Sequence, residues 1–169
     1  MPIPTPQPLA FALPRRRLLA GLLAAPLAGA AALLRPVLAR AEPIFAVGGI
    51  AVRGTDVVAY FTEGRPVPGL PAFAHDWQGA SWRFASAANR DRFATDPARY
   101  APAYGGFCAY AVSEGYTAPI DPAAWRIVDG RLFLNFDRGV QRRWERDIPG
   151  RIARGDANWP RLAAQPPAR

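Results

Sequence analysis

The chain has 169 residues, half of them hydrophobic, and its 21 arginines against 13 acidic residues give a formal net charge of +8. Five of those arginines fall within residues 1–41, which leaves 16 arginines against 13 acids, a net charge of +3, in residues 42–169. This mild excess is spread along the chain and gives no support for a nucleic-acid partner. One cysteine and one histidine exclude an internal disulfide and a cysteine-rich metal site.

Residues 1–41 have the three parts of a secretory signal peptide. Arg15-Arg16-Arg17 form a positive region, residues 18–34 are uncharged and largely apolar, and Ala39-Arg40-Ala41 match a small-x-small cleavage site. We therefore expect cleavage after Ala41 and a periplasmic or secreted protein. The arginine run followed by two leucines also resembles a twin-arginine (Tat) export signal. The alternative is an uncleaved anchor, but a spanning helix needs about 20 apolar residues, so we expect no stable membrane insertion.

Residues 42–160 are long enough for one domain with its own core, and residues 161–169 are predicted to be a flexible tail. The run 56–61 is β-branched and aromatic, which predicts a strand. Two aromatic runs around Gln78-Gly79, over 73–77 and 81–86, predict a β-hairpin. Ser86 is a suitable N-cap for a helix over 87–96.

The next elements are likewise predicted from capping and turn residues. Pro97 predicts the first position of another helical turn. Asp129-Gly130 between two runs of strand-forming residues predicts a tight hairpin over 125–136. Asp137 can cap a helix over 138–148, and residues 149–160 are predicted to add one last turn and stop. Short hairpins and short helices without a βαβ rhythm predict a single α+β domain.

Residues 105–112, "GGFCAYAV", fit a strand or a helix, and we favour the helix. If Gly105-Gly106 precede its start, Cys108 lies in the first turn. There the unpaired backbone amides and the helix dipole would lower the pKa of the thiol.

Several stretches resemble the exported proteins built on a YHS domain, over nearly all of 54–160. The stretch "SWRFASAANRDRFATDPARY" contains the pattern aromatic-x-Phe-x-Ser, then Phe, then Asp-Pro-x-x-Tyr. Its residues are Trp82, Phe84, Ser86, Phe93, Asp96, Pro97 and Tyr100. The resemblance implies metal handling, because proteins of the wider YHS group occur beside copper-transporting ATPases and metal binding has been proposed for them.

The cysteines of the metal-linked YHS pattern are absent from this chain. The three matching positions hold Ala59, Ala85 and Asn89. Soft metals such as Cu(I) prefer thiolate ligands, so only Cys108 remains to supply one, with His75 as its nearest candidate companion.

Three functions stay open, and a non-enzymatic protein is favoured over an enzyme. The first is binding or handling of a metal, most plausibly a copper ion, through Cys108 and His75, with a metal-transport partner protein. The second is thiol-based redox or peroxide response by Cys108, with a redox partner. The third is a structural or partner-binding module with Cys108 in the core.

Four further residues are candidates for lining a pocket. Tyr60, Tyr104 and Tyr110 flank the cysteine segment or precede it, and such tyrosines are commonly core aromatics whose hydroxyl groups are hydrogen-bonded. Asp121 precedes a proline and is read first as a turn residue, with a role as an oxygen ligand as the alternative.

Overall fold

The computed structural model describes residues 43–165, and all structural statements below concern this part of the chain. The predicted signal peptide and the last four residues of the predicted tail lie outside it. The strands are β1 (Ala46–Val47), β2 (Ile50–Ala51), β3 (Leu70–Trp77), β4 (Ala80–Phe84), β5 (Asp121–Val128) and β6 (Arg131–Asn135). The α-helices are α1 (Ala59–Thr62), α2 (Ala87–Thr95), α3 (Pro97–Tyr100), α4 (Ala109–Ser113), α5 (Arg138–Trp144) and α6 (Ile148–Ala163). Three 3-10 helices, η1 (Val52–Gly54), η2 (Ala103–Gly106) and η3 (Glu145–Asp147), complete the list.

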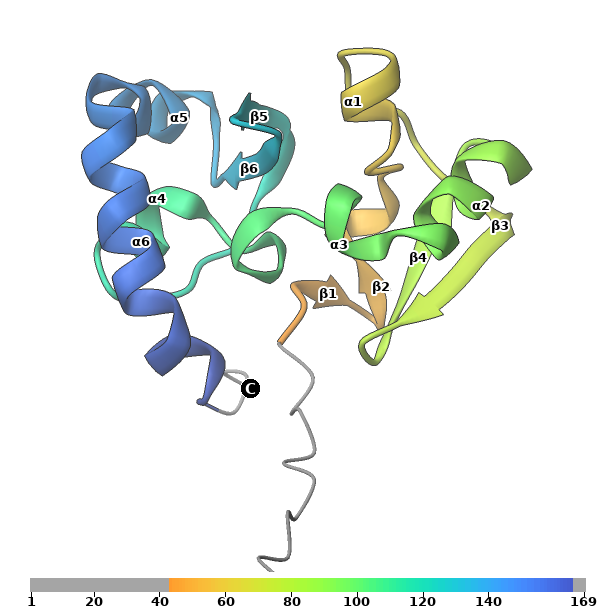
Figure 1. The fold of residues 1–169 in the computed structure, drawn as a ribbon, viewed down its shortest axis with the longest axis horizontal. Helices are drawn as coiled ribbons and strands as arrows, with labels where there is room; N and C mark the ends of the chain where they lie inside the picture. The colour runs from red at the N-terminus through yellow and green to blue at the C-terminus, as the bar shows by residue number, and fades with distance from the viewer. Residues whose placement is uncertain (1–42, 166–169) are drawn as a thin grey trace, which may run out of the picture. The chain divides into compact units, whose positions relative to one another are not determined.

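Two sheets form the framework, and both contain a hairpin predicted from the sequence (Figure 1). The four-stranded sheet has the order β1-β2-β4-β3, with β2 parallel to β4 and the other pairs antiparallel. The second sheet is the β5–β6 hairpin alone. Gln78-Gly79 and Asp129-Gly130 turn the two hairpins with positive φ at both residues, as primed turns require. The α+β class is confirmed.

Side-chain caps fix the start of four helices. Ser86, Asp96, Asp137 and Asp147 each accept a hydrogen bond from a backbone N–H three residues later. Each cap satisfies one of the amides that the first turn of a helix leaves without a partner. The predicted caps of α2 and α5 are therefore confirmed.

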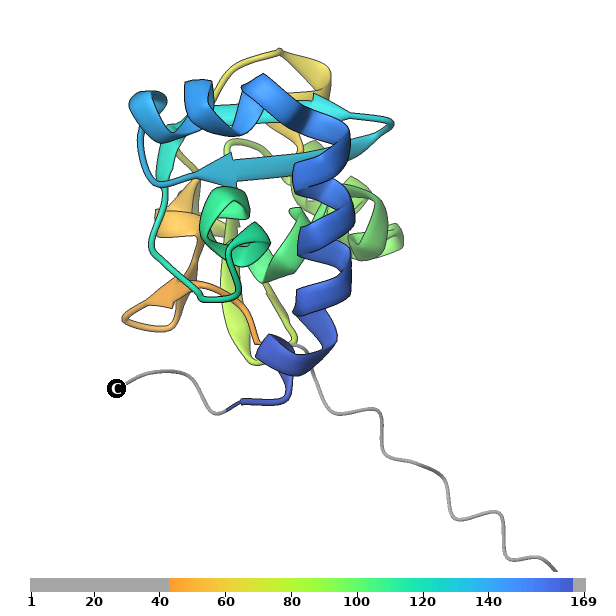
Figure 2. The ribbon, with the colours of Figure 1, turned by 90° about the vertical axis from the view of Figure 1, so that its left-hand side faces the viewer.

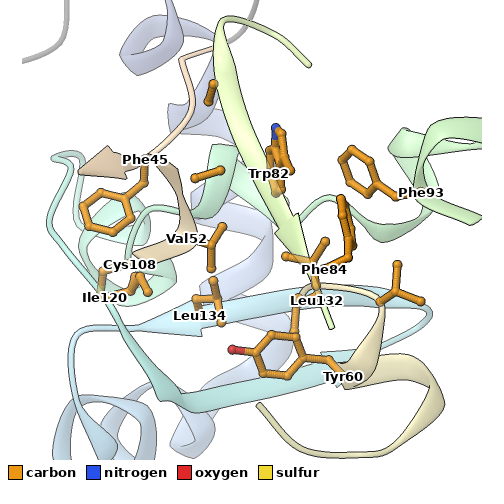
Figure 3. Close-up of a cluster of buried hydrophobic side chains, with 14 of the residues drawn as sticks. Phe45, Val52, Tyr60, Trp82, Phe84, Phe93, Cys108, Ile120, Leu132 and Leu134 are labelled. Carbon is orange, nitrogen blue, oxygen red and sulfur yellow. The ribbon is translucent and has the colours of Figure 1, made fainter. Parts of the chain in front are cut away.

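The buried side chains form two clusters. The larger one lies between the four-stranded sheet, α2 and the β5–β6 hairpin, and includes Trp82, Phe84, Phe93, Leu132 and Leu134 (Figure 3). The smaller one joins η2, α4, β6, α5 and the end of α6. Figure 2 shows α5 over the β5–β6 hairpin and α6 beside α4. Among residues 43–165 we find no helix long and apolar enough to cross a bilayer.

The strand predicted over 56–61 is wrong. Val57 and Val58 form a turn and the helix α1 follows. The reason is Asp56, which is fully buried and whose Oδ1 accepts the N–H groups of Val58 and Ala59 at 2.9 and 3.2 Å. Its Oδ2 accepts the N–H of Ala85 and the side-chain amide of Asn89, both at 2.8 Å. A buried carboxylate thus overrides the strand preference of the β-branched residues.

The single last turn predicted after residue 148 is also wrong, because α6 is a helix of 16 residues. Its two glycines and Pro160 have low helix propensity, so the sequence does not predict a long helix here. The helix continues through Pro160 to Ala163, and Leu162 is buried. The structure therefore places the first residues of the predicted tail in a packed helix.

Candidate functional site

Cys108 lies in the core rather than at an accessible helix start. It is the N-cap residue of α4 and only 1% of it is exposed. Figure 3 shows it among Phe45, Val52 and Ile120. Burial raises the pKa of the thiol, although the backbone amides of Tyr110 and two other residues act in the opposite direction. The predicted lowering of this pKa is wrong, because loss of solvent outweighs the favourable amides.

The polar neighbour of the thiol is Asn135, which the sequence analysis did not identify. Asn135 is fully buried, and its Oδ1 accepts the N–H of Tyr110 at 3.2 Å and lies 3.9 Å from Cys108 Sγ. Its Nδ2 has no hydrogen-bond acceptor among the described residues. No sequence signal marked Asn135, since the groups that it contacts, Cys108 and Tyr110, lie 27 and 25 residues earlier in the chain.

His75 is placed away from Cys108. It lies on β3, and its ring contacts that of Phe93 with centroids 6.0 Å apart. Phe93 and Cys108 lie at opposite sides of the cluster in Figure 3. The structure therefore does not bring the predicted cysteine–histidine pair together.

The residues around Cys108 do not fit a copper ion. Cu(I) favours thiolate and imidazole ligands, and here the side chain that forms a hydrogen bond with the thiol is a neutral amide. Within residues 43–165, no three side chains of the His, Cys, Asp and Glu types are grouped as a metal site would require. Thiol redox chemistry also needs an accessible, ionisable sulfur, and Cys108 is buried with a raised pKa.

Tyr60 and Asp121 do lie close together, and their contacts indicate a structural role. Tyr60 donates its hydroxyl hydrogen to the carbonyl of Pro122 at 2.8 Å, and its ring packs on Trp125. Burial, followed by the negative charge of Asp121, raises the pKa of Tyr60. Asp121 itself accepts the N–H of Ala123 at 2.8 Å, but it is the first residue of strand β5, so its reading as a turn residue is wrong.

Tyr110 packs the face of its ring against Arg151. The guanidinium carbon of Arg151 lies 4.1 Å from the ring centroid, which is a close cation–π contact. The ring is half-buried between α4 and the arginines of the C-terminal helices. This arrangement joins α4 to α6 and indicates a packing role.

Tyr104 lies at the wall of a groove with a volume of about 460 Å³. Four segments far apart in the sequence line this groove: the β3–β4 turn, the α3–η2 region, the β5–β6 turn and α6. Their side chains include three aromatic rings and four polar groups. These are Trp77, Tyr104, Trp159, Gln78, Arg99, Arg131 and Asp156.

A hydrogen-bond network fixes one side of the groove. Tyr104 donates its hydroxyl hydrogen to Asp156 Oδ1 at 3.0 Å, and Arg131 donates to both carboxylate oxygens of Asp156 at 2.8 and 3.1 Å. The guanidinium of Arg131 holds the pKa of Asp156 below its usual range. Burial, together with the Asp156 carboxylate, raises the pKa of the Tyr104 hydroxyl. Tyr104 therefore stays a neutral donor and Asp156 an anion near neutral pH.

The backbone of the groove adopts unusual conformations. Tyr104 has φ of 57° and Gln78 has φ of 50°, both in the left-handed region. A side chain on Gly155 would collide with the Tyr104 hydroxyl, so this glycine of α6 makes room for the network. The hairpin turn accounts for the value at Gln78, but Tyr104 is in no hairpin, and left-handed non-glycine residues of this kind concentrate at functional sites.

The sequence analysis found part of this groove. It singled out Tyr104, and it predicted the Asp129-Gly130 turn that lies at the groove. It gave no indication of Gln78, Asp156 or Trp159 as site residues, because their meeting depends on how α6 packs against the hairpin turns. Comparison with known proteins adds no assignment, since no family model, no curated protein and no solved structure matches this chain.

Proposed function

We propose that this chain is an exported, non-enzymatic binding module whose binding site is the groove beside Tyr104, with Cys108 as a core residue. The export part of the proposal rests on residues 1–41 alone. The observation that supports binding is the groove itself, in which four segments bring aromatic rings and an ordered polar network together. Concave sites with apolar walls and a few placed polar groups are typical of small-molecule binding.

The ionisable groups of the groove favour binding over catalysis. Asp156 is engaged by Arg131 and Tyr104, and its lowered pKa makes it a weak base at neutral pH. The raised pKa of Tyr104 makes this hydroxyl a weak acid. No cysteine, serine or histidine is among the residues that line this groove within the described chain. Such groups can orient a ligand through hydrogen bonds without exchanging protons with it.

The test is a ligand panel combined with a variant that fills the groove. Ala98 is exposed on α3 at the groove, so Ala98→Trp should occupy the space without disturbing the core. The melting temperature of the purified protein is measured with carboxylic acids, amino acids, neutral monosaccharides and inorganic phosphate. A compound that binds only the folded protein raises this temperature. We expect at least one class to stabilise the wild type but not Ala98→Trp, and equal behaviour of the two proteins with every class would overturn the proposal.

Copper handling through Cys108 stays a prediction of the family resemblance, and a separate titration addresses it. Cu(I) is added anaerobically against a competing chelator to the wild type and to Cys108→Ala. Under our proposal the two proteins behave alike. Tight one-to-one binding that disappears in Cys108→Ala would overturn the role assigned to Cys108 and direct attention to the core around Asn135.

A further inference from the structure

The groove contains a polar atom whose hydrogen-bonding capacity is unmet. Gln78 Oε1 is buried and accepts no hydrogen bond from any residue between 43 and 165. Gln78 lines the groove at the β3–β4 turn, next to Trp77. A buried acceptor without a donor is unfavourable, and rotation of the side chain toward a ligand that offers an N–H or O–H group would relieve it.

The groove also contains one cation that no carboxylate neutralises. Arg131 is paired with Asp156 through two hydrogen bonds. Arg99 is exposed on α3, and within the described chain its guanidinium forms no ion pair, only a cation–π contact with Tyr100 at 5.6 Å. The charged groups of the groove therefore sum to one positive charge. Arginine binds carboxylates well, because its planar fork can donate two parallel hydrogen bonds.

The remaining wall is aromatic. Trp77 and Trp159 are both half-buried, and the Trp159 ring lies 5.8 Å from that of Tyr104. Aromatic rings of this kind offer large contact areas to an apolar group of a ligand. The volume of the groove is within the range of small-molecule sites.

We infer that the groove binds a small organic acid with three features: a carboxylate for Arg99, an adjacent hydroxyl or amino donor for Gln78, and an apolar group for the tryptophans. This inference rests on the proposed function and specifies its ligand class. Hydroxy acids and amino acids share this chemistry, and the test includes one of each.

Four related compounds, all with the apolar ring, separate the carboxylate from the adjacent donor. 3-Phenyllactate and phenylalanine have the carboxylate, the adjacent donor and the ring. 3-Phenylpropionate lacks the donor, and 3-phenylpropane-1,2-diol lacks the carboxylate. We expect phenyllactate or phenylalanine to bind about tenfold more tightly than either of the latter two, as measured by calorimetry. The tighter of the two complete ligands identifies hydroxyl or amino as the preferred donor.

Two variants assign the preferences to residues. Arg99→Gln should erase the preference for the carboxylate and keep that for the donor. Gln78→Asn shortens the amide while tolerating positive φ, and it should erase the preference for the donor alone. Arg142→Gln is the matched control, because Arg142 lines a different groove formed by α5 and η3. It should leave all four affinities within twofold.

Three outcomes would overturn the inference: no binding of any of the four compounds, equal affinity for all of them, or preferences that survive both variants. The groove-filling variant separates this failure from that of the proposed function. If a neutral sugar or phosphate stabilises the wild type but not Ala98→Trp, the groove is a binding site and only the ligand class is wrong. If Ala98→Trp changes nothing with any compound, both proposals fail.

Discussion

Tyr104 and Cys108 stand at the two ends of the short segment "YGGFC", and both are buried, yet their polar neighbours differ. The Cys108 thiol is enclosed by core side chains, and its side-chain hydrogen-bond partner is the buried amide of Asn135. The Tyr104 hydroxyl reaches Asp156, whose side chain is 47% exposed, at the wall of a groove. Rarity in the sequence drew attention to Cys108, whereas the geometry draws it to Tyr104.

The difference shows that the chemical distinctiveness of a residue and the polar network around it are separate properties. A lone cysteine carries a reactive atom, but burial raises its pKa and removes it from contact with solutes. A tyrosine is ordinary in composition, but here it orders a carboxylate and an arginine around a cavity. Four measurements test this contrast.

The largest effect is expected from Gly105→Ala, between the two residues compared. Gly105 has φ of 60°, and a Cβ atom there would collide with the backbone carbonyl of Pro43. We expect a loss of about 3 kcal/mol in the free energy of unfolding, measured with urea. Gly130→Ala is the control, because Gly130 also has positive φ but open space around it, and it should lose about 1 kcal/mol. Equal losses would show that the close approach to Pro43 does not matter.

The second effect concerns the thiol. Cys108 should react with a thiol reagent on the order of a hundredfold more slowly in the native protein than in urea, because local opening must precede reaction. Cys108→Ala should lower the free energy of unfolding by about 1 to 2 kcal/mol through the small cavity that it leaves. Native reactivity within a few-fold of the unfolded rate would contradict the buried position.

The third effect tests the Tyr104 hydroxyl. Tyr104→Phe removes its hydrogen bond to Asp156 and should cost about 1 kcal/mol at pH 7. The pKa of Tyr104 is raised in the folded protein, so its contribution is complete below the unfolded value of about 10 and is lost as pH rises above it. The wild type should therefore lose stability more steeply above pH of about 10 than Tyr104→Phe does.

The chain contains no lysine, and its other tyrosines and Cys108 are present in both proteins, so the difference between the two curves reports on Tyr104. Tyr116→Phe is the control, because Tyr116 is 53% exposed. It should follow the wild type at every pH. If Tyr104→Phe also follows the wild type, the hydroxyl does not contribute to stability.

The smallest effect is expected at Asp156. Its pKa is lowered in the folded protein, so its contribution is present above the unfolded value of about 4 and is lost as pH falls below it. Because the ion pair with Arg131 is about half exposed, solvent screens it, and Asp156→Asn should cost only about 0.5 kcal/mol at pH 7. This difference should vanish near pH 2 in urea unfolding. A difference that persists at pH 2 would show that charge is not its origin.

Much of the local structure could be predicted from neighbouring residues. Asp129-Gly130 indicated a hairpin turn because both positions need positive φ, and Ser86 and Asp137 indicated helix starts because their side chains accept backbone N–H groups. The prediction failed over 56–61, where Asp56 binds distant groups at Ala85 and Asn89. It failed again at α6, whose glycines and proline are tolerated because the helix packs on α4.

The α+β class, the two hairpins and most caps could be predicted from the sequence, since each depends on the conformational preferences of a few adjacent residues. Packing between distant segments sets the burial of Cys108 and the position of His75 away from it. The same packing brings Tyr104, Arg131 and Asp156 together at a groove. Those facts depend on contacts between residues far apart in the chain, such as the hydrogen bonds between Arg131 and Asp156. Local propensity carries no information about them, because packing of the whole core sets which distant side chains become neighbours.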